Sequence, residues 1–260
     1  MSHISFSALK IWDECPYKYK LSYIDRINVF EGNIYTAFGS AMHEVCEKTI
    51  LNEWDNNKAP ENFQKSFAEE YKSLPQEIKL NTDKKLLKDM FSQGTYLSPL
   101  AVPFLKKYFG EFEVISSEEQ LFEPIVEFKK EDYDFKGFVD LFIKTSDGKY
   151  HIIDWKTCSW GWDMKKKTEP ITTYQLTLYK HYLCQKHNID PKNVETYFAL
   201  LKRTAKKNQV EIFRVTSGAK KTKNALNLLN KALYNIDNKL FIKNRLSCSR
   251  CEFYKTKHCN

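Results

Sequence analysis

The sequence predicts an α/β fold in which helices flank a mixed central β-sheet. Three observations support it. Apolar residues recur at helical spacing over about the first 110 residues, strand-like runs begin near residue 112, and later helical runs separate further strands. We expect one integrated domain with three parts: a helical N-terminal region (1–110), an α/β core (111–242) and a cysteine-rich tail (243–260).

The N-terminal region contains helix start signals. Ser5 is placed to cap a helix over SFSALKIWDE, and Pro16 begins a second short helix. After a turn at 31–33, the run GSAMHEVCEKTILNEW has helical periodicity. We expect two more helices with Lys-rich outer faces to form a lid or arch over the sheet, at about 61–73 and 82–109.

The core alternates between strands and helices. A turn at 146–148 joins two of the strands as a hairpin, which makes the sheet mixed rather than purely parallel. The predicted strands are 112–116, 118–128, 133–145, 149–157, 194–202 and 209–216, and the predicted helices are 172–187 and 218–240.

Composition narrows the class of protein. The chain has 41 basic and 33 acidic residues, a net charge of +8, which favours an acidic partner such as DNA, although a solvated lysine surface also explains it. The lysine-rich bias is typical of a phage or AT-rich genome. We find no secretory signal, no membrane span and no glycine-rich nucleotide motif, and therefore expect a soluble cytoplasmic protein without a motor of its own.

Asp154 and Lys156 lie two positions apart in an apolar strand, so their side chains share one face. The hairpin brings Asp140 of the preceding strand toward them. Two carboxylates and a lysine suit a hard divalent cation, Mg²⁺ or Mn²⁺, and the lysine can orient a water and offset charge developing on a phosphate. The alternative is an ion pair on an edge strand.

The segments GFVD (137–140), IIDWKT (152–157) and QLTLY (175–179), with Gly39-x-x-x-His43 upstream, resemble the PD-(D/E)XK nuclease superfamily. Within it, the chain is most similar to RecB-like recombination exonucleases and CRISPR-associated exonucleases, over essentially its whole length. The resemblance implies metal binding by His43, Asp140, Asp154 and an upstream acid, which we assign to Glu119, with Glu118 and Glu123 as alternatives. It also implies a catalytic set of Lys156, Asp154, Asp140, Gln175 and Tyr179.

The function implied is a metal-dependent hydrolase: a sequence-nonspecific DNA exonuclease acting on single strands or DNA ends. Recombination and repair, phage replication and CRISPR spacer acquisition all remain open as its setting, with a separate helicase or recombination protein as a partner. Two alternatives remain. One is an endonuclease on the same core, and the other is a non-catalytic nucleic-acid-binding subunit.

The seven cysteines form no secretory disulfide pattern, but Cys248, Cys251 and Cys259 lie within twelve residues. Cys15, followed by proline, is a candidate fourth ligand. The resemblance implies that these four hold a structural [4Fe–4S] cluster, because iron–sulfur members of the family take one ligand before the core and three after it. Zinc bound by the same thiols, or by three of them with His258, is the alternative.

Basic residues near the predicted site are candidates for sequence-independent phosphate contacts. Tryptophans at 155, 160 and 162 are candidates for stacking on unpaired bases, although a role in the core explains them too. The basic candidates are Lys165, Lys166, Lys167, Lys202 and Arg203, with solubilising loops as the alternative explanation.

Overall fold

A computed structural model describes residues 2–27, 32–128 and 133–259, so the predicted turn at 31–33 begins outside the described residues. Its strands are β1 (Ser2–Ser5), β2 (Phe112–Pro124), β3 (Tyr133–Thr145), β4 (Tyr150–Cys158), β5 (Val194–Lys202) and β6 (Val210–Val215). Its α-helices are α1 (Phe6–Glu14), α2 (Pro16–Tyr19), α3 (Ile34–Ile50), α4 (Ala59–Ser73), α5 (Gln76–Asn81), α6 (Lys84–Phe109), α7 (Met164–Thr168), α8 (Pro170–His187) and α9 (Ala219–Asp237). Short 3₁₀ or π turns occur at Lys20–Ile24, Asn56–Lys58, Pro191–Asn193 and Arg245–Arg250.

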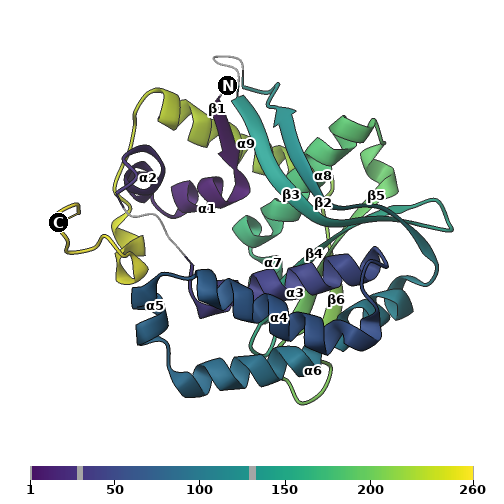
Figure 1. The fold of residues 1–260 in the computed structure, drawn as a ribbon. Coiled ribbons are helices and arrows are strands. Elements are labelled where there is room, and N and C mark those ends of the chain that lie inside the picture. Colours follow the sequence, from purple (N-terminus) through teal and green to yellow (C-terminus); the bar gives the residue numbers. More distant parts are fainter. Residues whose placement is uncertain (1, 28–31, 129–132, 260) are drawn as a thin grey trace.

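The described strands form one mixed sheet with the order β1–β3–β4–β5–β6, and β2 pairs with β3 (Figure 1). The pairs β1–β3 and β4–β5 are parallel, whereas β2–β3, β3–β4 and β5–β6 are antiparallel. The predicted turn is present, with Gly148 in the left-handed region at φ +84°. The predicted α/β fold with a mixed sheet is therefore confirmed.

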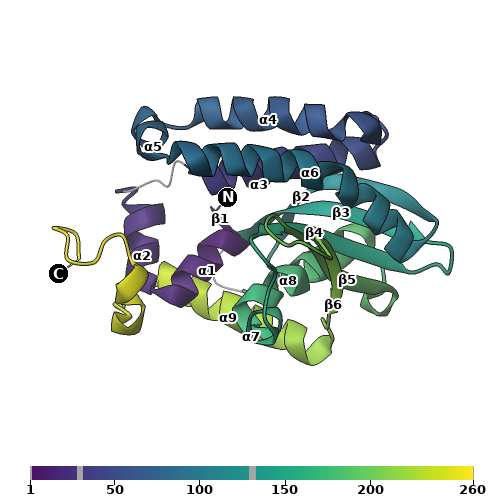
Figure 2. The ribbon, with the colours of Figure 1, turned by 90° about the horizontal axis from the view of Figure 1, so that it is seen from below.

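Helices cover both faces of the sheet, which gives three layers (Figure 2). On one face, α3 and α6 pack on the sheet and α4 lies over these two helices, where the rings of Phe38, Phe63 and Phe67 contact one another. On the other face, α1, α8 and α9 pack around Phe135, whose ring stacks on that of Tyr182 at 4.5 Å. Of the two helices that we expected to arch over the sheet, α6 packs directly on it, whereas α4 is separated from it by α3 and α6 (Figure 2).

Local signals in the N-terminal region hold in part. Ser5 Oγ accepts a hydrogen bond from the Ala8 amide at 3.2 Å, as the cap prediction requires, and Pro16 begins α2. Residues 2–5, however, form strand β1 beside β3, although the sequence placed them in a helical region. Four residues are too few to show a period, and the pairing depends on a strand about 130 positions away.

The predicted strands 112–116 and 118–128 are wrong as separate elements. Residues 112–124 form the single strand β2, which pairs with β3 along its length and has a register shift between Val114 and Ser116. The two serines that follow Ile115 resemble a break in the sequence, but here they accompany a bulge within one strand. Within the described residues, no helix is long and apolar enough to cross a membrane.

We predict that Gly94→Ala destabilises the helical layer. A Cβ at Gly94 of α6 would lie 2.0 Å from Cζ of the buried Phe63 ring of α4. Overpacking of this kind costs about 1–3 kcal/mol, more than the roughly 1 kcal/mol that alanine gains in helix propensity. Urea unfolding measures the difference. Gly39→Ala, also within a helix but with only Thr157 Oγ1 near its Cβ, at 3.6 Å, is the control. Equal stability of Gly94→Ala and the unmodified protein would contradict this packing.

Candidate active site

Three side chains that could hold a metal ion converge beside the sheet: His43 of α3, Glu118 of β2 and Asp140 of β3. One ligand atom from each lies within 4.8 Å of the other two. His43 Nδ1 is 3.4 Å from Asp140 Oδ2. Two carboxylate oxygens and an imidazole nitrogen are a donor set that divalent cations such as Mg²⁺ and Mn²⁺ accept. The residues therefore fit a divalent metal.

The site lies where two strands, β1 and β4, separate from each other along one edge of β3; we call this point the fork. Strand β2 occupies one edge of β3, and the other edge is shared by β1, which pairs with residues 133–136, and β4, which pairs with 141–144. Residues 137–140 lie between these two pairings. The ladder between β3 and β4 ends at Leu141–Ile153, so Asp140 and Asp154 are the next residues on either side. The fork therefore leaves room for polar groups within an otherwise apolar sheet.

Asp154 is the most deeply buried group of the site, with only 1% of its surface exposed. Its Oδ2 lies 2.6 Å from Lys156 Nζ, and its Oδ1 accepts a hydrogen bond from Gln175 Nε2 at 2.8 Å. Gln175 also donates to the hydroxyl of Tyr179 at 3.3 Å, one helical turn along α8. These contacts hold Asp154 and Lys156 in place from the helical layer opposite α3.

Tyr179 lies close to the backbone of β3. A Cβ on Gly137 would lie 2.8 Å from a ring carbon of Tyr179, which is tighter than side chains tolerate. Glycine at this position thus lets α8 approach the strand that carries Asp140. Burial and the nearby Asp154 carboxylate raise the pKa of Tyr179 to about 12, so its hydroxyl keeps its proton at neutral pH.

The crowded carboxylates shift the pKa values of the site. Burial, reinforced by the neighbouring Asp154, raises the pKa of Asp140, and burial with Asp140 raises the pKa of Glu118 to about 7. Burial and the positive charge of Lys156 lower the pKa of His43, which keeps the imidazole neutral, as a metal ligand must be. Burial opposes the charge on Lys156, but Asp154 and Asp140 outweigh it and raise the pKa of its ammonium group.

Of the two acids that we considered at this point of β2, Glu118 and not Glu119 lies beside His43 and Asp140. Glu119 lies on the other side of β2, where its carboxylate contacts Lys186 at 2.8 Å and His187 at 2.6 Å. Glu118 stands between the pairs that β2 forms with residues 141 and 139, opposite Asp140, and its φ of +48° marks an irregular point in the strand. Side chains alternate along a strand, so a one-residue error in register selects the wrong acid.

The family model of the PD-(D/E)XK nuclease superfamily matches residues 3–256. The chain belongs to this superfamily. No curated protein matches the sequence. Among solved structures, a protein from Eubacterium rectale named as a candidate exonuclease is similar with a TM-score of 0.62 and 14% identity, over 96% of this chain and 86% of that one. A second, named SSO0001, has a TM-score of 0.39 at 13% identity, over 82% and 91% of the two chains, and supports no inference.

The four cysteines that we expected to share a metal group line one pocket between α2 and the C-terminal segment. They are Cys15, Cys248, Cys251 and Cys259. Among the described residues, no three of these sulfur atoms lie within 4.8 Å of one another. All four are free thiols. The structure thus brings together the cysteines that the sequence singled out, without forming a close tetrahedral group.

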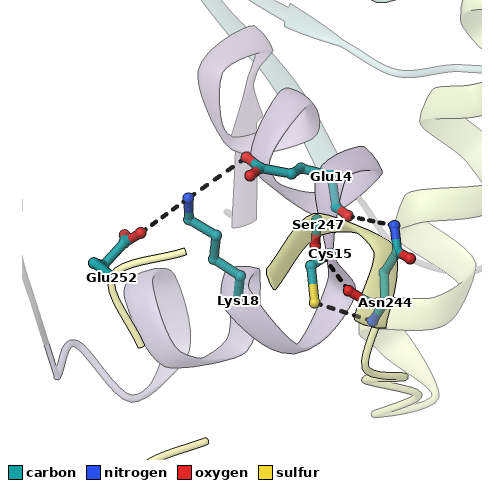
Figure 3. A network of polar contacts seen from close by, with 6 residues as sticks. All are labelled: Glu14, Cys15, Lys18, Asn244, Ser247 and Glu252. Atoms are coloured by element: carbon teal, nitrogen blue, oxygen red, sulfur yellow. Dashed lines mark hydrogen bonds and ion pairs between the residues drawn. The ribbon is translucent and has the colours of Figure 1, made fainter. Parts of the chain in front are cut away.

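Polar contacts hold the tail against the N-terminal helices (Figure 3). The Asn244 amide donates to Cys15 Sγ at 3.3 Å, and its side-chain Nδ2 donates to the Glu14 carbonyl at 2.8 Å. Lys18 lies 3.1 Å from Glu252 and 3.5 Å from Glu14. The ends of the sequence, more than 220 residues apart, therefore meet at these cysteines.

Of the five basic side chains predicted to contact DNA, some form contacts within the protein and others are exposed to solvent. Lys167 and Lys202 both form ion pairs with Glu211, and Lys202 is only 8% exposed. Arg203 donates to Gln93 at 3.0 Å. These three are held by contacts within the protein, whereas Lys165 and Lys166 are exposed.

A cleft of about 590 Å³ is lined in part by Lys156 and Gln175. Its other basic side chains are Lys10, Lys166 and Arg203, and its aromatic side chains include Tyr35 and Trp162. Lys10 and Tyr35 are not recognisable as DNA contacts from the sequence, because nothing local shows that their helices border this cleft. Of the other tryptophans considered for stacking, Trp155 is 2% exposed and belongs to the core, whereas Trp160 is 77% exposed.

We predict that Glu118→Gln weakens Mn²⁺ binding by at least about 10-fold, because it removes one of three converging ligands. Glu119→Gln, one residue away, should leave the affinity unchanged, since its carboxylate faces Lys186 and His187. Isothermal titration calorimetry of the metal-free protein measures both. The reverse ranking would show that the register of β2 is wrong.

Proposed function

We propose that this protein is a metal-dependent DNA exonuclease that hydrolyses phosphodiester bonds without sequence preference, on single strands or DNA ends. The observation that carries the proposal is the convergence of His43, Glu118 and Asp140 beside the Asp154–Lys156 pair. Membership of the nuclease superfamily supports the reaction class, and the similar protein from Eubacterium rectale, named as a candidate exonuclease, supports the mode of cleavage.

We assign the metal to His43, Glu118, Asp140 and Asp154. A bound Mg²⁺ or Mn²⁺ would supply Lewis-acid chemistry, polarising the phosphate and acidifying a water. Lys156 supplies a fixed positive charge next to the acids. In this role it orients the attacking water and offsets the negative charge that develops on the phosphate oxygens. Gln175 and Tyr179 keep Asp154 and Lys156 in position through the hydrogen bonds to Asp154 Oδ1 and between their own side chains.

The cleft beside Lys156 is the proposed path for the DNA strand. Lys10, Lys166 and Arg203 can neutralise phosphates, and the aromatic rings in the cleft offer faces on which bases stack. None of these features reads a base edge, which agrees with cleavage that ignores sequence.

We expect Lys156→Ala to lower the rate of cleavage by at least about 10²-fold, because a preorganised charge at the reacting phosphate is lost. Circular dichroism and DNA affinity should change little. Lys149→Ala, at the exposed turn that precedes the same strand, is the matched control and should cleave normally. Unchanged turnover of Lys156→Ala would contradict the assignment of Lys156 as a catalytic residue.

A circular single strand separates an exonuclease from an endonuclease. With Mn²⁺, the protein should degrade an end-labelled linear oligonucleotide and leave a circle of the same sequence intact, since the circle offers no end. Cleavage of the circle at a similar rate would establish the endonuclease instead. Binding of both without cleavage would favour the non-catalytic subunit.

We further propose that Cys15, Cys248, Cys251 and Cys259 hold a structural [4Fe–4S] cluster. All four cysteines line one pocket between α2 and the C-terminal segment, which supports a shared metal group. An amide that already donates to Cys15 Sγ also suits a thiolate ligand.

Protein purified without oxygen should be brown, with broad visible absorption that dithionite bleaches. Cys251→Ser should lose this colour, and Cys158→Ser, outside the pocket, should keep it. Colourless protein that contains stoichiometric zinc would establish the zinc alternative.

A further inference from the structure

A large cavity is separate from the nuclease site. It has a volume of about 860 Å³, within the range of small-molecule sites, and lies where α8, β5, β6 and α9 meet. None of the residues assigned above to metal binding or catalysis lines it. Its walls are mostly apolar, with Val194, Val215 and Leu226 among them.

Lys180 of α8 is a cation in the wall of this cavity. The residue is only 9% exposed, and its ammonium group has no hydrogen bond or ion pair among the described residues. Its Nζ is not one of the unpaired polar atoms that the protein seals from solvent, so the buried stem presents an accessible ammonium group to the cavity. Partial burial lowers its pKa. The position suits an anion that enters from the cavity.

The acids that line the cavity already have partners. Glu195 accepts a hydrogen bond from Tyr197 at 2.6 Å and lies 3.2 Å from Arg214. Glu127 pairs with His181 at 3.0 Å, and Asp190 accepts from a backbone amide at its own turn. The lining has four basic side chains, Lys180, Lys192, Arg214 and Lys223, against the three acids, which leaves a net charge of +1 with His181 neutral.

The first turn of α9 also faces the cavity. Its N-cap is Gly218, which has no side chain to bond the free amides of the first turn. Gly218, Thr222 and Lys223 all line the cavity. The start of a 19-residue helix attracts anions through its amides and its dipole, and a hydroxyl and an ammonium group stand beside it.

The cavity thus combines a cationic end with an apolar wall, which together exceed what a simple inorganic anion requires.

We propose that this cavity binds a small organic phosphate of nucleotide size, with its phosphate at Lys180 and the start of α9. A nucleoside monophosphate has the required chemistry: an anionic group for the cationic end and a flat ring for the apolar wall. This second site goes beyond the nuclease function and does not depend on it.

Calorimetric titration with dAMP, in buffer containing EDTA so that the nuclease site carries no metal, tests the proposal. We expect dAMP to bind with a Kd below about 1 mM. Lys180→Met should weaken binding by at least about 10-fold, since it removes a charge-assisted contact, and should fold well because methionine keeps an apolar stem at this position. Lys220→Met, on α9 but outside the cavity, is the matched control. Lys223→Met provides a second variant at the cavity wall.

Three outcomes would overturn the proposal. The first is the absence of dAMP binding. The second is binding lost in Lys156→Ala but kept in Lys180→Met, which would place the nucleotide at the nuclease site as a product. The third is binding of deoxyadenosine as tightly as dAMP, which would show that the phosphate makes no contact, or binding of inorganic phosphate as tightly as dAMP, which would show that the nucleoside makes none.

Discussion

Two carboxylates that face each other past the last pair of an antiparallel ladder repel, and the site is organised around that repulsion. Asp140 and Asp154 are brought together by the register of β3 and β4 and are both largely buried. Lys156, the Gln175 amide and the Trp155 backbone amide each offset part of the charge. Glu118 then adds a third acid, which leaves the group short of positive charge and ready for a divalent cation.

The fork in the sheet lets these charged side chains be surrounded by polar groups instead of apolar ones. If β1 and β4 paired with β3 without interruption, the polar groups would lie within a continuous ladder covered by apolar helices. Because the two strands separate at residues 137–140, helices from both layers reach the same point. His43 arrives from α3, and Gln175 and Tyr179 arrive from α8. The three-layer architecture is thus a condition for assembling the site, and the bare backbone of Gly137 is a condition for the approach of α8.

The contacts between the ends of the chain serve the same architecture. Helix α1 belongs to the core that covers α8 and α9, and α2 extends from it to the C-terminal segment. Fixing that segment to α2 closes the chain into a ring, which holds the N-terminal elements against the sheet. A cross-link at this point restrains the strand β1, and therefore one side of the fork.

The sequence by itself determined most helices and strands of the core, because their apolar periods and turn residues act locally, although it divides β2 into two strands. Ser5, Pro16 and Gly148 mark element boundaries that the structure reproduces. The acid and lysine at 154 and 156 are conspicuous in a buried strand without any fold, whereas the selection of His43, Gln175 and Tyr179 follows from the resemblance to the nuclease superfamily. Tertiary structure decided what depends on distant neighbours: the pairing of β1 with β3, the choice of Glu118 over Glu119, and the burial of Trp155. In each case a strand's face or partner follows from register, which is set by contacts across the whole sheet rather than by the residues nearby.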